Sequence, residues 1–193
     1  MPVVVRPRPR NAAATRQAML QAAHARFLME NYENVGMRDI AGDVGVDVAL
    51  VSRYFGSKEK LFREVLRSDK GDKFRIAIDP ADLPAYLTSL ITQDDGGEDA
   101  EHLERLLIIL RSASSPRAAA IIRDAIHEDV FDPMIGLIGG DHADLRASFA
   151  MVVLMGTAIL RTIMRVEPLC EDCDEGAIAE RLTRLFETAL KPG

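Results

Sequence analysis

Apolar side chains recur every third or fourth residue along most of this 193-residue chain, and this spacing limits its possible folds more strongly than any motif does. Met19, Ala23 and Phe27 begin the pattern, and the breaks between successive stretches are rich in Gly, Pro and Asp. No strand-like alternation of useful length occurs in the sequence. The pattern therefore predicts an all-α fold.

The first third of the chain predicts three helices followed by a fourth. The first begins at Thr15 and ends near Tyr32, and a short second helix ends at Gly45, a residue suited to the left-handed C-cap. Asp47 begins the third helix and Ser57 the fourth, because their side chains can accept the free N–H groups of a first turn. Two short helices joined by a tight glycine turn predict a helix-turn-helix.

The remainder of the chain keeps the helical periodicity and gives candidate helices at 82–92, 99–112, 117–131, 142–165 and 175–190. Its longest uncharged run, 147–160, is flanked by Arg146 and Arg161. That run is shorter than the roughly 20 residues that span a bilayer. We therefore expect a helix buried in protein here, and no association with a membrane.

Net charge differs between the two ends of the chain, although the whole chain carries −6. Residues 1–67 contain 11 Lys and Arg against 7 Asp and Glu, a balance of +4, whereas the remainder holds 13 against 23, a balance of −10. A basic first third indicates that this part meets a polyanion, because phosphate binding depends on local positive charge. Chance scatter of charge is the alternative.

Cysteine content and the first residues bear on the compartment. Two cysteines without further paired spacing favour a reducing environment. The opening MPVVVRPRPR has too short an apolar run for a signal peptide. We therefore expect a cytoplasmic protein.

Several short residue groups in the first third stand in a fixed order. They are Ile40-Ala41, Gly45-Val46, Tyr54-Phe55 and Ser57-Lys58-Glu59 followed by Leu61-Phe62. In this combination residues 15–66 resemble the DNA-binding domain of TetR-family transcriptional regulators. The resemblance implies a sequence-specific regulator, more often a repressor, that binds a palindromic operator in double-stranded DNA as a homodimer. It also implies release from the operator by a small-molecule effector.

The third helix has one face suited to a protein core and one suited to DNA. The residues expected to point inward are Val51, Tyr54 and Phe55. The residues that then share the opposite face are Ala49, Ser52 and Arg53. Arg53 is the candidate for direct base readout, since arginine to guanine is the commonest specific contact. An ordinary exposed arginine is the alternative.

The resemblance implies further DNA contacts near helix starts and beside the fourth helix: Met37, Arg38, Val48, Ala49, Tyr54 and Lys58. Helix N-termini favour anions, which suits the placement. Lys58 would be a phosphate contact, with a solvated lysine as the alternative. Arg6, Arg8 and Arg10 lie in an expected flexible arm over residues 1–14 and could enter a minor groove. A tail without function is the alternative for that arm.

The sequence departs from the family pattern around the third helix. Asp47 stands where a serine is usual, Ala49-Leu50 where Gly-Thr is common, and Ser52 where a phosphate-binding tyrosine is frequent. Asp47 can still cap the helix, but it places a negative charge near DNA. These departures concern the affinity and the preferred operator, not the fold.

A helix-turn-helix domain at 15–68 and a ligand-binding and dimerisation domain at 69–193 follow from this interpretation. The apolar helix at 147–164 and the last helix resemble the pair that forms the family's dimer interface, with a monomeric core as the alternative. Three methionines could line an effector pocket or belong to the plain core: Met134, Met151 and Met155.

Other chemistry has weak signals in this sequence. Cys170 and Cys173 have the spacing of a zinc or redox pair, with an acidic loop as the alternative. Four neighbouring residues could hold a metal or form a solvated face: Asp124, His127, Glu128 and Asp132. No nucleophile–base pair, phosphate-binding glycine loop or HExxH spacing occurs, so we expect neither an enzyme nor a cofactor. The rival hypothesis is a helical small-molecule, metal or thiol sensor with weak or absent DNA affinity.

Overall fold

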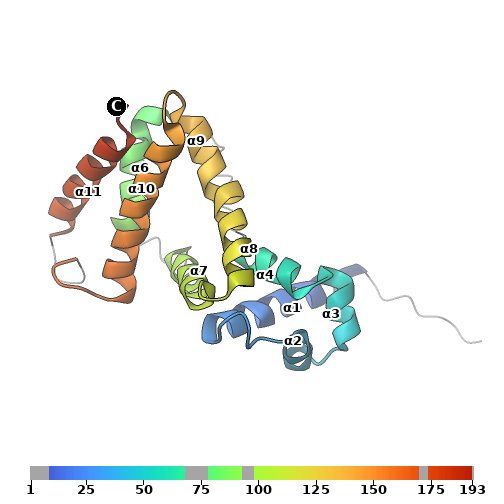
Figure 1. Ribbon diagram of the computed structural model, residues 1–193. Helices are drawn as coiled ribbons and strands as arrows, with labels where there is room; N and C mark the ends of the chain where they lie inside the picture. The colour runs from blue at the N-terminus through green and yellow to red at the C-terminus, as the bar shows by residue number, and fades with distance from the viewer. Residues whose placement is uncertain (1–8, 68–77, 93–97, 170–173, 193) are drawn as a thin grey trace, which may run out of the picture. The chain divides into compact units, whose positions relative to one another are not determined.

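The computed structural model describes residues 9–67, 78–92, 98–169 and 174–192, and within these ranges every regular element is a helix (Figure 1). This confirms the all-α prediction. The helices of the first third are α1 (Pro9–Met29), α2 (Met37–Val44), α3 (Val48–Phe55) and α4 (Lys58–Leu66). The others, with a 3₁₀ turn at η1 and π turns at η2 and η3, are η1 (Pro80–Asp82), α6 (Leu83–Thr92), α7 (Glu98–Ser112), α8 (Pro116–Ile126), η2 (His127–Phe131), α9 (Asp132–Ile138), α10 (Ala143–Ala158), η3 (Ile159–Ile163) and α11 (Glu175–Leu190).

The first helix begins six residues earlier than the sequence indicates. α1 starts at Pro9, not at Thr15, so residues 9–14 of the arm expected over residues 1–14 are helical. Proline is tolerated at the first helical position, because its missing N–H would have no partner inside the helix. Arg10 is therefore helical, whereas Arg6 and Arg8 lie outside the described residues.

A second difference is α9, which the sequence interpretation did not assign. The helix expected to end at residue 131 passes through the π turn η2 and continues as α9 to Ile138. Pro133 stands in the first turn of α9, where no backbone N–H is needed, so it does not end the helical course. Gly139, with φ of 56°, ends it.

The chain packs as two compact units. The first consists of residues up to Arg67 together with Glu104–Ala125, and the second of Ser68–Leu103 together with residues from Ile126 onward. The sequence interpretation places the whole of 69–193 in one domain, whereas Glu104–Ala125, which includes most of α7 and of α8, packs with the helices of the first third. Where the functional boundary lies stays a prediction.

The core of the first unit is aromatic. Phe27 of α1 meets Phe62 of α4 with ring centroids 4.7 Å apart, and Tyr32 meets Phe62 at 4.9 Å, both edge to face. Met19 and Ala23, on the same face of α1 as Phe27, are fully buried. This confirms the four-residue spacing as a core face, and it anchors α4 against α1.

The core of the second unit joins α6, α9, α10 and α11 through Leu83, Leu87, Met134, Ala147, Ala150, Met151, Leu182 and Phe186. α10 is covered on one side by these neighbours. On another side it exposes Leu145, Phe149 and Val152 by 53%, 55% and 68%. The sequence interpretation expected this apolar helix to be covered from several sides. Within this chain one side of α10 is left exposed.

The stretch Ala143–Ile163, which is α10 with η3, is long and apolar enough to cross a membrane. Only 28% of the most apolar 18 residues of this stretch is buried inside this chain. The core helix of a soluble protein can be equally long and apolar.

Candidate nucleic-acid interface

Two caps define the turn between α2 and α3. Gly45 ends α2 with φ of 71°, a left-handed conformation that glycine adopts at no steric cost. Two residues later the Asp47 carboxylate accepts a hydrogen bond of 2.7 Å from the Ala49 N–H. The turn between the helices is thus specified locally, as the sequence predicts.

The two faces of α3 separate clearly. Val51 and Phe55 are buried, and the Arg16 guanidinium of α1 lies 4.9 Å from the centroid of the Phe55 ring, so this side of α3 faces the protein. The exposed residues on the other side are Ala49, Ser52 and Arg53, which confirms the predicted outward face. Tyr54 is half-buried, with its ring centroid 6.5 Å from that of Phe55, so the prediction that it points into the core is only partly right.

Hydrogen bonds to carboxylates hold both ends of α2, and those at its second end tie it to α1. The Asp39 carboxylate accepts a 3.0 Å hydrogen bond from the Gly36 N–H at the start of α2. Near the end of α2, Asp43 accepts two hydrogen bonds from Arg26 of α1, from Nε at 2.5 Å and from Nη2 at 2.8 Å. The Arg26 guanidinium also lowers the pKa of Asp43 below its usual value. Met37, half-buried, and Arg38, exposed, lie in the first turn of this helix.

Lys58 points away from the outward face of α3. Its ammonium lies 4.3 Å from the centroid of the Tyr32 ring and donates a 3.5 Å hydrogen bond to the carbonyl oxygen of Glu33. Burial lowers the pKa of Lys58, although Glu33 and Glu59 act in the opposite direction. The structure therefore brings Lys58 to the turn after α1 and not beside Ala49 and Arg53.

The turn between α7 and α8 holds the segment that follows α1. The Ser115 hydroxyl donates a 2.5 Å hydrogen bond to Glu33 Oε1, and Arg111 Nη1 donates a 3.3 Å bond to the carbonyl oxygen of Met29. Ser115 Oγ also accepts a bond of 3.2 Å from the Ala118 N–H at the start of α8. Sequence reasoning missed these residues, because partners 82 positions apart leave no periodic signal.

Comparison with known families covers both units. The family described as "Bacterial regulatory proteins, tetR family" matches residues 19–65, and "Tetracyclin repressor-like, C-terminal domain" matches residues 88–190, more than half of the chain. The chain belongs to the TetR family. Its class is therefore that of DNA-binding transcriptional regulators, which are generally not enzymes.

Individual relatives match this chain with different sequence identities and over different shares of its length. The "HTH-type transcriptional regulator BetI" of Agrobacterium fabrum is 41% identical over 63 residues, which are 33% of this TetR-family chain and about a third (31%) of that relative. A crystal structure of a TetR-family regulator from Streptomyces coelicolor A3 is 26% identical, with a TM-score of 0.52 over 96% of this chain and 98% of that one. A regulator from Saccharomonospora viridis in complex with choline is 16% identical, with a TM-score of 0.58 over 91% and 96%, and shows the fold alone.

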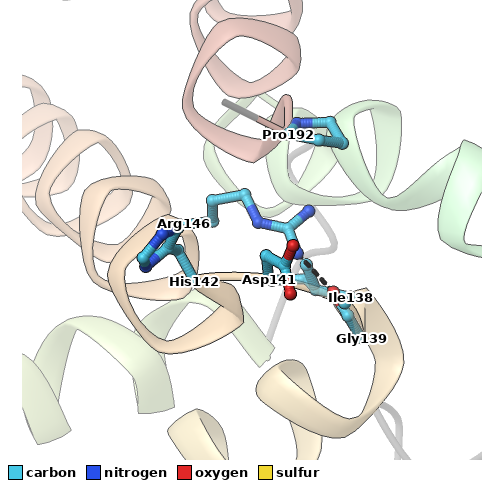
Figure 2. Close-up of a pocket in the computed structure, with 7 residues that line it drawn as sticks. Ile138, Gly139, Asp141, His142, Arg146 and Pro192 are labelled. Atoms are coloured by element: carbon cyan, nitrogen blue, oxygen red, sulfur yellow. Dashed lines mark hydrogen bonds between the residues drawn. The ribbon is translucent and has the colours of Figure 1, made fainter.

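The three methionines expected to line a pocket lie in the core of the second unit of this TetR-family chain. Met134 is fully buried, Met151 is nearly so, and Met155 packs against the same cluster. A cavity of about 550 Å³ lies elsewhere, lined by 138–142, Arg146 and Pro192, and none of the three methionines lines it. Figure 2 shows the Arg146 side chain at this cavity.

Arg146 has a structural role in that cavity. Its Nη1 donates a 3.2 Å hydrogen bond to the carbonyl oxygen of Leu190. Its Nη2 donates to the carbonyl oxygen of Gly139, as Figure 2 shows. A cation there binds the carbonyl ends of α11 and α9, which carry partial negative charge. The buried guanidinium thus ties the ends of two helices to α10.

The alternative metal sites have no support in the described parts of the chain. Among those residues, no three or more His, Cys, Asp or Glu side chains gather closely enough to hold a metal ion. Asp124, His127, Glu128 and Asp132 therefore do not form such a group. Cys170 and Cys173 lie outside the described residues.

Proposed function

We propose that this TetR-family chain is a cytoplasmic repressor that binds a palindromic operator in double-stranded DNA as a homodimer and is released by a small molecule. The observation that carries the proposal is the outward face of α3, where Ala49, Ser52 and Arg53 are exposed on a helix held by caps and a buried opposite face. Such a helix fits the major groove of B-DNA.

Each residue of the face has a distinct role in this proposal. Arg53 reads a base edge, because its planar guanidinium can donate two hydrogen bonds to guanine. Ala49 has a side chain small enough for close approach, and Ser52 supplies a hydroxyl donor. Four flanking residues contact the backbone or the groove edges beside them: Met37, Arg38, Val48 and Tyr54. Lys58 reaches a phosphate only by leaving the Tyr32 ring.

The homodimer is proposed from the exposed apolar face of α10. Leu145, Phe149 and Val152 follow one another at intervals of four and three residues, so they form one stripe along the helix. A contiguous apolar stripe of this kind is typical of a protein–protein interface. A second copy would cover it and would present two α3 helices, as binding to two half-sites one helical turn apart requires.

Release by an effector is proposed for the second unit. The related regulator from Saccharomonospora viridis is described in complex with choline, and a small-molecule site in this family fold supports an effector here too. Met134, Met151 and Met155 are the proposed lining, because unbranched thioether side chains can rearrange around a ligand.

The deciding experiment measures binding of the purified protein to duplex DNA taken from upstream of its own gene, with a scrambled duplex for comparison. We expect tighter binding to the upstream duplex, and we expect Arg53→Ala to remove that preference, a loss of about 1–3 kcal/mol in discrimination. Arg123→Ala is the control, since Arg123 is an exposed arginine of α8. Absence of binding to either duplex at low salt would overturn the proposal.

A second candidate is a ligand sensor with little affinity for DNA. Asp47 favours it, because the exposed carboxylate at the start of α3 repels phosphate where other family members carry serine. This candidate predicts that small molecules raise the melting temperature while no duplex is bound at any salt concentration.

A further inference from the structure

We propose that Lys60, in the first turn of α4, contacts a DNA phosphate and extends the outward face of α3 beyond the last turn of that helix. The inference rests on the proposed DNA-binding function and adds a residue that the family resemblance did not indicate. Three observations support it: the position of Gly56, the course of the Lys60 side chain, and the opposite course of Lys58.

Gly56 continues the outward face of α3. It follows Ser52 by four residues and Arg53 by three, which places it on the same side of the helical course. Gly56 is exposed, and its φ of 79° is a conformation that other residues rarely adopt. The outward face of α3 therefore ends in backbone without a side chain, and a neighbouring side chain can lie over it.

Lys60 occupies that space. A Cβ atom on Gly56 would lie 3.4 Å from Lys60 Cδ and 3.8 Å from Lys60 Nζ. The Lys60 side chain therefore extends from α4 across the turn, and its ammonium lies near the end of α3. Lys60 is exposed, and among the residues that the structure describes no carboxylate pairs with it.

Lys58 and Lys60 take opposite directions from the same helix turn. Two residues along an α-helix correspond to a rotation of about 200°, so neighbours at this spacing point to opposite sides. Lys58 goes to the Tyr32 ring and the Glu33 carbonyl oxygen, where it is partly buried. Lys60 is consequently the cation of this turn whose side chain lies over Gly56, at the end of α3.

A phosphate is the group that this lysine suits. An ammonium is a compact charge on a flexible stem, which favours a point contact with phosphate over the planar, two-bond recognition of a base edge. One added phosphate contact steepens the dependence of log affinity on log salt by about 1. It strengthens binding to every duplex alike, because phosphates carry no sequence information.

The test measures fluorescence anisotropy with the upstream duplex and a scrambled duplex over a series of salt concentrations, using the full chain. We expect Lys60→Ala to weaken binding to both duplexes by the same factor and to reduce the salt slope by about 1, and Lys60→Arg to keep the slope. Arg67→Ala, at an exposed arginine just after the last turn of the same helix, is the matched control and should leave the slope unchanged. Melting curves by circular dichroism establish that each variant is folded.

The outcomes separate this inference from the proposed function. If Lys60→Ala leaves affinity and slope unchanged while Arg53→Ala abolishes the preference for the upstream duplex, DNA binding stands and the Lys60 contact is wrong. If Lys60→Ala changes the preference between duplexes instead, Lys60 reads a base and the phosphate contact is wrong. If the unaltered protein binds neither duplex at low salt, both proposals fail together.

Discussion

The Ser115 hydroxyl, just before α8, donates a 2.5 Å hydrogen bond to Glu33 Oε1 in the turn after α1. The Ser115 oxygen also accepts from the Ala118 N–H and so caps α8. We expect Ser115→Ala to lower the free energy of unfolding by about 1–3 kcal/mol, because it removes a cap and leaves a carboxylate without its donor. Urea unfolding measures this. Ser114→Ala, at the exposed neighbouring serine, is the control and should have a far smaller effect.

The ion pair between Arg26 and Asp43 predicts a pH dependence of stability. Hydrogen bonds from Arg26 lower the pKa of Asp43 in the folded state, so the carboxylate stabilises the fold above its unfolded pKa of about 3.9. This contribution is lost as the pH falls through the folded pKa. Asp43→Asn should therefore be less stable than the unaltered protein at pH 7, and the difference should disappear in acid.

The control for that pH dependence is a double-mutant cycle with Arg26→Gln. Once Arg26 is replaced, Asp43→Asn should cost nothing further at pH 7, because the two side chains act as one pair. Urea midpoints at neutral and acidic pH provide the measurement. An equal effect of Asp43→Asn in both backgrounds would show that the pair does not carry the pKa shift.

The charge of Asp47 is predicted to weaken DNA binding. Replacement by asparagine would retain the cap, since asparagine is as good an N-cap as aspartate, and would remove the negative charge at the start of α3. We expect Asp47→Asn to tighten binding by about two- to fivefold at low ionic strength, with a smaller gain as salt screens the charge. Anisotropy titrations at two salt concentrations measure the effect.

Asp47→Ala separates the cap from the charge in this experiment. It removes both, so it should lower the free energy of unfolding by about 1 kcal/mol, which Asp47→Asn should not do. Weaker DNA binding by Asp47→Asn than by the unaltered protein would contradict the expectation of charge repulsion.

The stripe on α10 predicts the oligomeric state. Phe149→Glu places a charge in the middle of the exposed apolar residues, and a buried unpaired charge is strongly unfavourable. We therefore expect a dimer to become a monomer, as measured by sedimentation or by light scattering after size exclusion. Met29→Glu, at a residue of the first unit with 71% exposure, is the matched control and should leave the mass unchanged. A monomeric unaltered protein would contradict the proposed homodimer.

Local features of the fold could be predicted well. The caps at Gly45, Asp47 and Ser57 act within four residues, and each one forms as its sequence context indicates. The outward face of α3 follows in the same way from a spacing of three and four residues. The segment that forms α9 was not assigned, because the helix expected over 117–131 continues through the π turn η2, where the regular helical spacing of apolar residues is interrupted.

Contacts that depend on packing could not be predicted. Residue order was enough to show which segments are helical, where most of them end, and that Ala49 and Arg53 share one side of α3, because these follow from short-range hydrogen bonds and helical periodicity. The packed helices were needed to show that Lys58 lies on Tyr32 and that Lys60 lies beside Gly56. A side chain's direction is chosen by neighbours from distant parts of the chain, which become neighbours only when the helices pack.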